Sequence, residues 1–250
     1  MVLPEHKARV RALAASFERG AQGRDPLSLA RAIGADLQYG DLGDKDGAFD
    51  PSRGVILLNK ASGPERQRFT LAHELTHALI LNDGDLLSDL HDAYEGDDLE
   101  EAIEVLCNVG ASAILVPQEE LEKLLGKCGR GARAVPKIAQ TFGVSRAAAC
   151  IALAQNLSGK AIVAILRPRG RGKSRRLEVE FSTKSDGMKY SLSPGVAMPE
   201  EHAAEVAYET GLPIERPDFI PFRSGRRMPA NVDAFPEGGT VYAVFTAAPA

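Results

Sequence analysis

The sequence has few of the residues that mark secreted or membrane-spanning chains. It has no tryptophan and only three cysteines, Cys107, Cys128 and Cys150, with no CxxC pair among them. This scattered, odd set argues against a disulfide framework or an all-cysteine zinc site, and it favours a reducing compartment. The sequence contains no run of about 18 apolar residues, so no membrane span is predicted. The amphipathic N-terminus lacks the apolar core of a signal peptide. We therefore expect a cytoplasmic protein with buried free thiols and no membrane partner.

The sequence also lacks a strong excess of either charge. The formal net charge is -4, and 26% of the 250 residues are charged while 44% are hydrophobic. This balance implies no overall attraction to nucleic acid and argues against a disordered chain. The length is sufficient for one large domain or for two to three small ones.

Hydrophobic periodicity and turn residues divide the first half of the chain into helices with a small sheet between them. We expect helices at 5–18, 26–33, 64–82, 99–115 and 119–125, and strands at 37–42 and 55–58. The turn-forming stretch 43–47 favours a hairpin or small sheet from these two strands. The acidic stretch 83–98 is expected to be a loop with one helical turn.

The second half begins with two short helices and then changes to strands. Residues 135–157 have the pattern of a helix-turn-helix, with Gly143 in the turn. We then expect strands at 161–167, 176–182, 188–193 and 240–247 and a helix near 200–210. The basic stretch Arg167–Arg176 is expected to be a solvated hairpin loop. The predicted fold class is α+β.

The chemically most informative segment is His73-Glu74-Leu75-Thr76-His77, in the helix expected at 64–82. Residues four apart on a helix differ by about 40° in direction and about 6 Å in height, so His73 and His77 can reach one metal ion. Glu74 is adjacent, where its carboxylate can polarise a metal-bound water without being a ligand. This HExxH pattern is typical of metallopeptidases, because the metal acidifies a water whose proton the carboxylate then takes.

A polar turn on a surface helix would produce the same five residue types by chance. Here, however, apolar residues surround the motif on several sides of the helix, among them Phe69, Ala72 and Leu79. That pattern predicts a buried helix, in which polar side chains without partners are costly. A bound metal would supply the partner.

A catalytic metal also needs a third protein ligand and one open position. Asp83 lies at the last position of an extended HExxHxxGxxD pattern, but Ile80 replaces the glycine of that pattern. His91 lies in the acidic stretch and is a further candidate. Glu104 is the strongest, because it lies on the next helix among apolar neighbours, where a carboxylate needs a partner. The alternative for Glu104 is a salt bridge to an arginine such as Arg68.

Two segments resemble the ImmA/IrrE family of metallopeptidases. RQRFTLAHELTHALIL is similar to the His-Glu-x-x-His helix of that family. EVLCNVGASAILVP is similar to its next helix, which has alanine or cysteine in the pattern Glu-x-x-[Ala/Cys]-Asn and ends in Leu-x-x-Pro. The sequences at 91–97 and at 220–227 also resemble the family, so that the resemblance runs from about Gly47 to Phe245.

The resemblance implies that His73, His77 and Glu104 hold one Zn²⁺ or Mn²⁺ ion per chain and that Glu74 is the general base. It implies a metallopeptidase-like domain at 1–126, a helix-turn-helix segment at 127–158 and a GAF-like domain at 159–250. The implied substrate is a helix-turn-helix transcriptional repressor, whose cleavage switches on DNA repair after radiation or desiccation damage. Zinc suits two histidines and a carboxylate, and the same ligands accept manganese.

Two basic features have both a functional and a structural interpretation. The helix-turn-helix offers mainly Arg146 and Gln155 to base edges, so we expect DNA binding to be weak or absent. Arg223, Arg226 and Arg227 form either a patch for an anion, a small ligand or the substrate, or pairs with nearby carboxylates.

The acidic stretch is expected to border the active-site cleft. His91 or Tyr94 within it would be able to stabilise an oxyanion. The alternative to a peptidase is a non-catalytic DNA-binding or ligand-sensing transcriptional regulator on a peptidase scaffold. The complete HExxH pattern favours the peptidase, because a scaffold has no use for the base.

Overall fold

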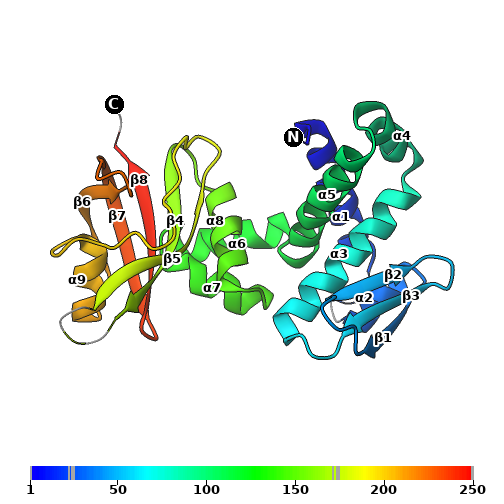
Figure 1. Ribbon diagram of the computed structural model, residues 1–250, viewed down its shortest axis with the longest axis horizontal. Coiled ribbons are helices and arrows are strands. Elements are labelled where there is room, and N and C mark those ends of the chain that lie inside the picture. Colours follow the sequence, from blue (N-terminus) through cyan, green and yellow to red (C-terminus); the bar gives the residue numbers. More distant parts are fainter. Residues whose placement is uncertain (1, 22, 24–25, 171, 173–174, 249–250) are drawn as a thin grey trace. The chain divides into compact units, whose positions relative to one another are not determined.

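The computed structural model describes residues 2–21, 23, 26–170, 172 and 175–248, and the chain divides into two compact units (Figure 1). The first unit is Met1–Glu120 and the second is Leu121–Ala250, so the division falls within helix α6, Gln118–Cys128. Both helices and sheets occur in each unit, as expected for an α+β chain.

The first unit consists of five helices and three strands in the part of the chain that is described. In chain order they are α1 (Pro4–Gly20), α2 (Pro26–Ala32), β1 (Asp36–Gly40), β2 (Gly47–Asp50), β3 (Val55–Asn59), α3 (Pro64–Asn82), α4 (Gly84–Ala93) and α5 (Asp97–Leu115). Proline stands at the first position of both α1 and α3, where its missing N–H costs nothing.

The three strands form a sheet in the order β1-β3-β2. Of the two expected alternatives for 37–42 and 55–58, the small sheet is confirmed and the hairpin is wrong, because β1 pairs with β3 in parallel. The turn at 43–47 leads instead into β2, a strand that the sequence pattern did not reveal, and β2 forms the antiparallel hairpin with β3. The Asn59 amide holds this connection by donating hydrogen bonds to the carbonyl oxygens of Gly43 and Lys45.

The acidic stretch after α3 is more regular than the sequence predicted. Residues 84–93 form the ten-residue helix α4 rather than a loop with a single turn. The Asp83 carboxylate caps this helix by accepting a hydrogen bond from the Leu86 N–H. Leu86 and Leu90, one turn apart, are both buried, so packing of this apolar stripe offsets the repulsion among the acidic residues.

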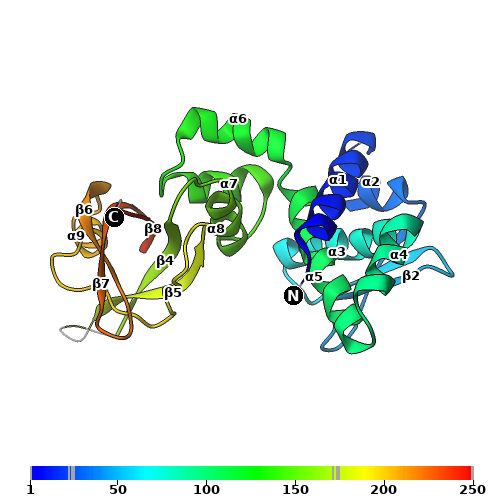
Figure 2. The same cartoon turned by 90° about the horizontal axis from the view of Figure 1, so that it is seen from above.

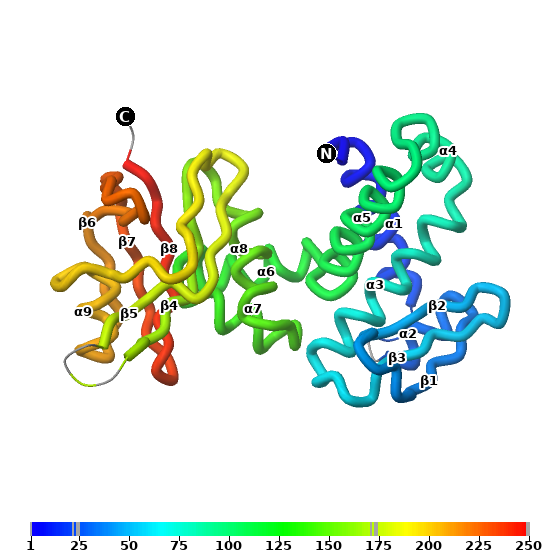
Figure 3. Tube along the Cα trace, viewed as in Figure 1, coloured from blue at the N-terminus to red at the C-terminus, as the bar shows by residue number. Residues whose placement is uncertain are grey.

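Helix α3 is the centre of the first unit. It contacts β2 and β3 on one side and α5 on another, as the chain trace shows (Figure 3). Its buried residues Leu71, Ala72 and Leu75 pack with Ile56 and Leu58 of β3. The prediction of a buried HExxH helix is thereby confirmed, and the motif is placed between a sheet and a second helix.

The second unit contains a five-stranded antiparallel sheet in the order β5-β4-β8-β7-β6. Its elements are α7 (Ala134–Phe142), α8 (Arg146–Gln155), β4 (Ala161–Arg169), β5 (Arg176–Lys184), α9 (Ala203–Thr210), β6 (Ile214–Pro221), β7 (Arg227–Glu237) and β8 (Thr240–Ala247). Helix α9 contacts β6, β7 and β8, whereas α8 contacts β4 and β5 (Figure 2). Strand β4 is buried at six successive positions, 161–166, as expected for a strand covered on both faces.

Two strand predictions in the second unit need correction. Residues 188–193 are not a strand; Met188 and Leu192 are buried in the core, so their apolar pattern reflects burial without strand pairing. Strands β6 and β7 were not expected, because prolines such as Pro217 and Pro229 interrupt the strand pattern. Strand β6 is an edge strand, where a missing backbone N–H is tolerated.

The segment 134–155 forms two helices joined at Gly143, which adopts a left-handed conformation with φ of 59°. The Ser145 hydroxyl then caps α8 by accepting the Ala148 N–H. Of the expected basic loop, Arg167 and Arg169 end β4 and Arg176 begins β5, while Arg171, Lys173 and Ser174 lie outside the described residues. In the described ranges, no helix is both long enough and apolar enough to cross a membrane.

His202 caps helix α9 with a buried side chain. Its Nδ1 accepts the Ala204 N–H, and its Nε2 lies 2.9 Å from the Phe219 carbonyl oxygen. These partners require a neutral ring protonated on Nε2. Burial lowers the pKa of His202 below its ordinary value of 6.5, and the nearby Asp218 carboxylate only partly opposes this effect.

The lowered pKa of His202 predicts that acid destabilises the second unit. The unfolded chain takes up a proton on this ring at a higher pH than the folded chain does, so the His202 contribution is present above pH 6.5 and is lost as pH falls below it. We expect urea unfolding midpoints to fall across this window. His202→Asn keeps a capping oxygen without a titrating ring and should flatten the dependence; an unchanged slope would contradict this account.

Candidate metal centre

The HExxH motif lies in the middle of α3, where the helix is packed against the sheet and α5. His73 and His77 are one turn apart, and their ring centroids are separated by 4.9 Å. The His73 side chain is 15% exposed and that of His77 is 26% exposed, so both rings reach solvent from a largely buried position. A helix with an apolar core face thus presents two imidazoles at its margin.

The two imidazoles and Glu104 bring their ligand atoms to one point. The His73 and His77 Nε2 atoms are 3.2 Å apart. The Glu104 carboxylate spans them, with Oε2 lying 3.3 Å from His73 Nε2 and Oε1 lying 3.3 Å from His77 Nε2. In the described part of the chain these two histidines are the ion-pair partners of Glu104, and Arg68 is not.

This spacing fits a tetrahedral metal ion. Nitrogen and oxygen ligands at about 2.0–2.1 Å from zinc lie about 3.3–3.4 Å from one another when the site is tetrahedral. The 3.2 Å between the two imidazole nitrogens and the 3.3 Å from each nitrogen to one of the two Glu104 oxygens lie near this value. Burial and the neighbouring His73 lower the pKa of His77, which favours the neutral imidazole that metals bind. The donor set therefore fits a single divalent cation.

Glu74 lies beside this group with a distinct environment. Burial raises the pKa of its carboxyl; His73 lowers it, Glu104 raises it, and a hydrogen bond from the Phe49 backbone N–H lowers it. Phe49 belongs to β2, so the carboxylate is held between α3 and the edge of the sheet. A carboxyl whose pKa is raised by burial is a stronger base and is suited to accept and return a proton.

Comparison with known proteins agrees with this geometry. The family model of the IrrE N-terminal-like domain matches residues 30–154. The radiation response metalloprotease IrrE of Deinococcus deserti is 49% identical over 246 residues, covering 96% of this chain and 88% of that protein. The chain belongs to the IrrE family of radiation response metalloproteases. The IrrE protein of Deinococcus radiodurans is 43% identical over 258 residues, covering 98% of this chain and 79% of its own length.

A solved structure extends the comparison to the fold. A transcriptional regulator of Mycobacterium tuberculosis superposes with a TM-score of 0.56, covering 98% of this chain and 81% of that chain at 16% identity. At this identity the likeness concerns the fold alone. Membership of the IrrE family makes the chain a relative of metalloproteases. The family names do not specify which metal is bound.

Cys107 is a site residue that the sequence analysis missed. It was assigned only as a buried thiol, and it is buried, but its Sγ and the ligand nitrogens of His73 and His77 all lie within 4.8 Å of one another. Burial raises the pKa of the Cys107 thiol, and the Glu104 and Glu74 carboxylates raise it further. By contrast, burial alone raises the pKa of Cys150 to about 12. The Glu104-x-x-Cys107 spacing was the available signal, because residues three apart share a helix face.

A close contact between α3 and α5 sets the position of these donors. Gly110 of α5 faces Thr76 of α3, and a Cβ atom added at Gly110 would lie 2.3 Å from Thr76 Cγ2 and 2.6 Å from its Oγ1. Thr76 is fully buried, and its hydroxyl donates to the Ala72 carbonyl oxygen. Only glycine allows the helices to approach this closely.

The other ligand and oxyanion candidates have different surroundings. Asp83 caps α4 and forms two 3.0 Å hydrogen bonds with Arg9, so its carboxylate is already engaged. His91 is exposed in the last turn of α4. The Tyr94 hydroxyl accepts the Leu3 N–H at 2.9 Å and contacts His6, and these contacts lie with the N-terminal helix.

The arginine patch lies around the turn between β6 and β7. Arg223 donates to the Pro194 carbonyl oxygen at 2.6 Å, and the Arg227 guanidinium lies 4.5 Å from the Phe219 ring centroid. Arg226 is exposed. Within the described ranges none of these three arginines pairs with a carboxylate, so the expected carboxylate partners are not found.

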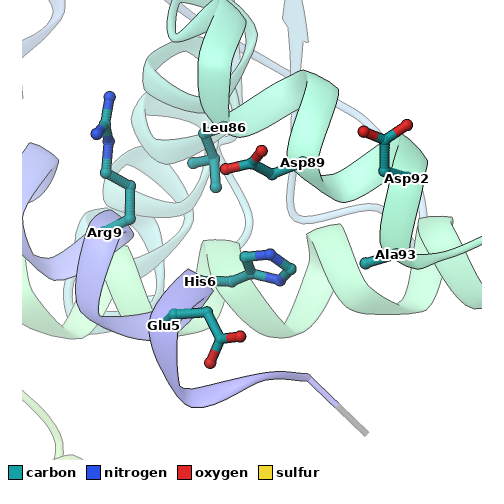
Figure 4. Close-up of a pocket in the computed structure, with 7 residues that line it drawn as sticks. All are labelled: Glu5, His6, Arg9, Leu86, Asp89, Asp92 and Ala93. Carbon is teal, nitrogen blue, oxygen red and sulfur yellow. The ribbon is translucent and has the colours of Figure 1, made fainter.

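The first unit also has a surface cavity of about 440 Å³, formed by α1 and α4 (Figure 4). Asp89 and Asp92 line it from α4, opposite Glu5, His6 and Arg9 from α1. None of the donors described above lines this cavity. The candidate metal centre is therefore separate from this cavity, and its identification depends on its chemistry.

The tight contact at Gly110 predicts that a single methyl group perturbs the metal centre. Gly110→Ala should separate α3 from α5, cost about 1–3 kcal/mol of stability and weaken zinc binding, because Glu104 and Cys107 move with α5. Gly126→Ala in α6 is the matched control, since a Cβ there meets nothing within 4 Å and should be neutral or stabilising. Urea unfolding and zinc titration measure both effects, and equal behaviour of the two variants would refute the contact argument.

Proposed function

We propose that the chain is a metal-dependent endopeptidase in which His73, His77 and Glu104 hold one Zn²⁺ or Mn²⁺ ion and Glu74 is the general base. The observation that carries this proposal is the convergence of the three ligand groups at 3.2–3.3 Å, with Glu74 adjacent. Membership of a metalloprotease family supports the same assignment.

The residues divide the chemistry between them. When bound, the metal supplies Lewis acidity that polarises the scissile carbonyl and lowers the pKa of water. Glu74 accepts the proton of the attacking water and returns it to the departing amine. Its burial suits both transfers, because a raised pKa makes the carboxyl a stronger base and keeps the proton available for the amine. Glu104, with a side chain that is 58% exposed, is the ligand and not the base.

The edge of the sheet offers a place for a peptide substrate. Strand β2 is an edge strand, and Asp46 directs its carbonyl oxygen to the Asn59 N–H of the neighbouring β3 segment. Because backbone groups alternate in direction, those of Gly47 and Phe49 point away from β3. The Phe49 N–H does so, since it donates to Glu74. An extended substrate added along this edge would place its carbonyl groups beside the base.

We infer further that the substrate is a helix-turn-helix transcriptional repressor and that cleavage switches on a radiation or desiccation response. The support is the resemblance in sequence and the two relatives named as radiation response metalloproteases. In this proposal residues 127–158 are a helix-turn-helix segment and 159–250 a GAF-like domain. The helix pair with a left-handed Gly143 and the five-stranded sheet with α9 support these assignments.

The second candidate is a regulator that binds DNA or a ligand without catalysis. The arginines without carboxylate partners near the β6–β7 turn favour a site for an anion or small ligand. The helix-turn-helix offers less, because the Arg146 guanidinium lies over the Tyr242 ring at 5.9 Å from its centroid. Such a regulator would be indifferent to the loss of the Glu74 carboxylate.

The peptidase proposal predicts the effect of removing the base. Glu74→Gln should retain the metal and lower the rate of repressor cleavage by about 100- to 10,000-fold, because the amide cannot take the proton. In the assay, the protein is first stripped of metal with a chelator and then reloaded with zinc or manganese. It is then mixed with the host's helix-turn-helix repressor. Glu101→Gln makes the same change at an exposed position of α5 and should cleave as the unaltered chain does.

If only one of the two metals restores cleavage, that metal is the active one. If neither metal supports cleavage by the unaltered chain while both are bound, the peptidase proposal is wrong. Binding of DNA or of an anion that is unaffected by Glu74→Gln would then favour the regulator.

A further inference from the structure

Cys107 is a metal donor that the proposed peptidase mechanism does not use. It lies one turn after Glu104 on α5, fully buried, and its Sγ is part of the group of donors that meets within 4.8 Å. In the described ranges, the group of side chains with metal-binding geometry consists of His73, His77 and Cys107. Cys107 packs in an apolar cluster with Leu106, and it also lies near the Glu104 and Glu74 carboxylates.

Among the proposed donors His73, His77, Glu104 and Cys107, the Cys107 sulfur lies on the side away from solvent. Glu104 approaches the two imidazoles with a side chain that is 58% exposed, whereas Cys107 approaches from the buried side of α5. In a tetrahedral zinc site a sulfur at about 2.3 Å from the metal lies about 3.6 Å from each imidazole nitrogen. The Cys107 Sγ lies within 4.8 Å of both imidazole ligand atoms, so a side-chain rotation or a small helix shift is enough to bring it to the metal.

We propose that Cys107 is the fourth protein ligand of the resting metal centre. This inference rests on the metal site of the proposed function. Two ligands from α3 and two from α5 then close the site, and catalysis requires the sulfur to withdraw so that water can take its position, because a catalytic metal needs one open coordination position. On coordination the thiol loses its proton to solvent and the thiolate binds the metal.

The thiolate also selects the metal. Soft sulfur ligands favour zinc, whereas carboxylate and water ligands suit manganese. With Cys107 bound, the resting site discriminates in favour of zinc. Without it, the same His73, His77 and Glu104 set accepts either ion. The residue therefore decides which metal the full chain carries before it meets substrate.

Cobalt tests this ligand without any measurement of activity. The full chain, stripped of metal, is titrated with Co²⁺ under reducing conditions and its absorption spectrum is recorded. We expect the near-ultraviolet charge-transfer band of a thiolate bound to Co²⁺, together with visible bands of a tetrahedral site. Cys107→Ser should lose the charge-transfer band and keep the visible ones, and Cys150→Ser, which also removes a buried thiol, should keep both.

Competition with zinc and manganese provides the second readout. Cys107→Ser should raise the dissociation constant for zinc by at least about tenfold and leave that for manganese nearly unchanged. Urea unfolding of the metal-free variants checks that each is folded. The spectrum of the unaltered chain decides the matter even if Cys107→Ser does not fold.

The outcomes separate the two proposals. Visible bands that depend on His73 and His77, without a thiolate band, would overturn the role of Cys107 and leave the peptidase site intact. A thiolate band that persists in Cys107→Ser would overturn it as well. If Co²⁺ binding is unaffected by His73→Ala and His77→Ala, the metal site of the proposed function fails together with this inference.

Discussion

The closeness of α3 to α5 is the constraint on which the site depends. Helix α3 supplies His73, Glu74 and His77, but a metal requires further donors, and these come from α5. Gly110 permits the approach, because any larger residue there would meet the buried Thr76. The sheet holds the opposite side of α3, where β2 contributes the Phe49 N–H to Glu74. Packing thus fixes the separation between the donors, and that separation selects the chemistry.

The proposed site assigns different roles to its two carboxylates because their surroundings differ. Glu104 is largely exposed and spans the two imidazole nitrogens, as a ligand must. Glu74 is more deeply placed, bonded to the backbone of the edge strand, and its pKa is raised by burial. A buried carboxyl with a raised pKa is commonly the one that transfers protons. The division of labour therefore follows from position on the two helices.

Much of this could be predicted from sequence, because helices carry their signals locally. The apolar surroundings of the motif indicated a buried α3, and the apolar neighbours of Glu104 indicated a carboxylate in need of a partner, which the structure provides in His73 and His77. The features that the sequence did not predict depend on contacts between distant parts of the chain. Three features follow from tertiary contacts: the parallel pairing of β1 with β3, the proline-bearing strands β6 and β7, and the closeness of the buried Cys107 to His73 and His77. Helix α4 was not predicted because its many acidic residues favoured a loop, although Leu86 and Leu90 have helical spacing.

The most direct test of the account is a crystal structure of the zinc-loaded chain with anomalous scattering recorded at the zinc edge. The account predicts one strong peak about 2.0–2.2 Å from the Nε2 atoms of His73 and His77 and from a Glu104 carboxylate oxygen. The Glu74 carboxylate should lie beyond direct coordination. A peak held by other residues, or no peak between α3 and α5 when zinc is bound in solution, would contradict it.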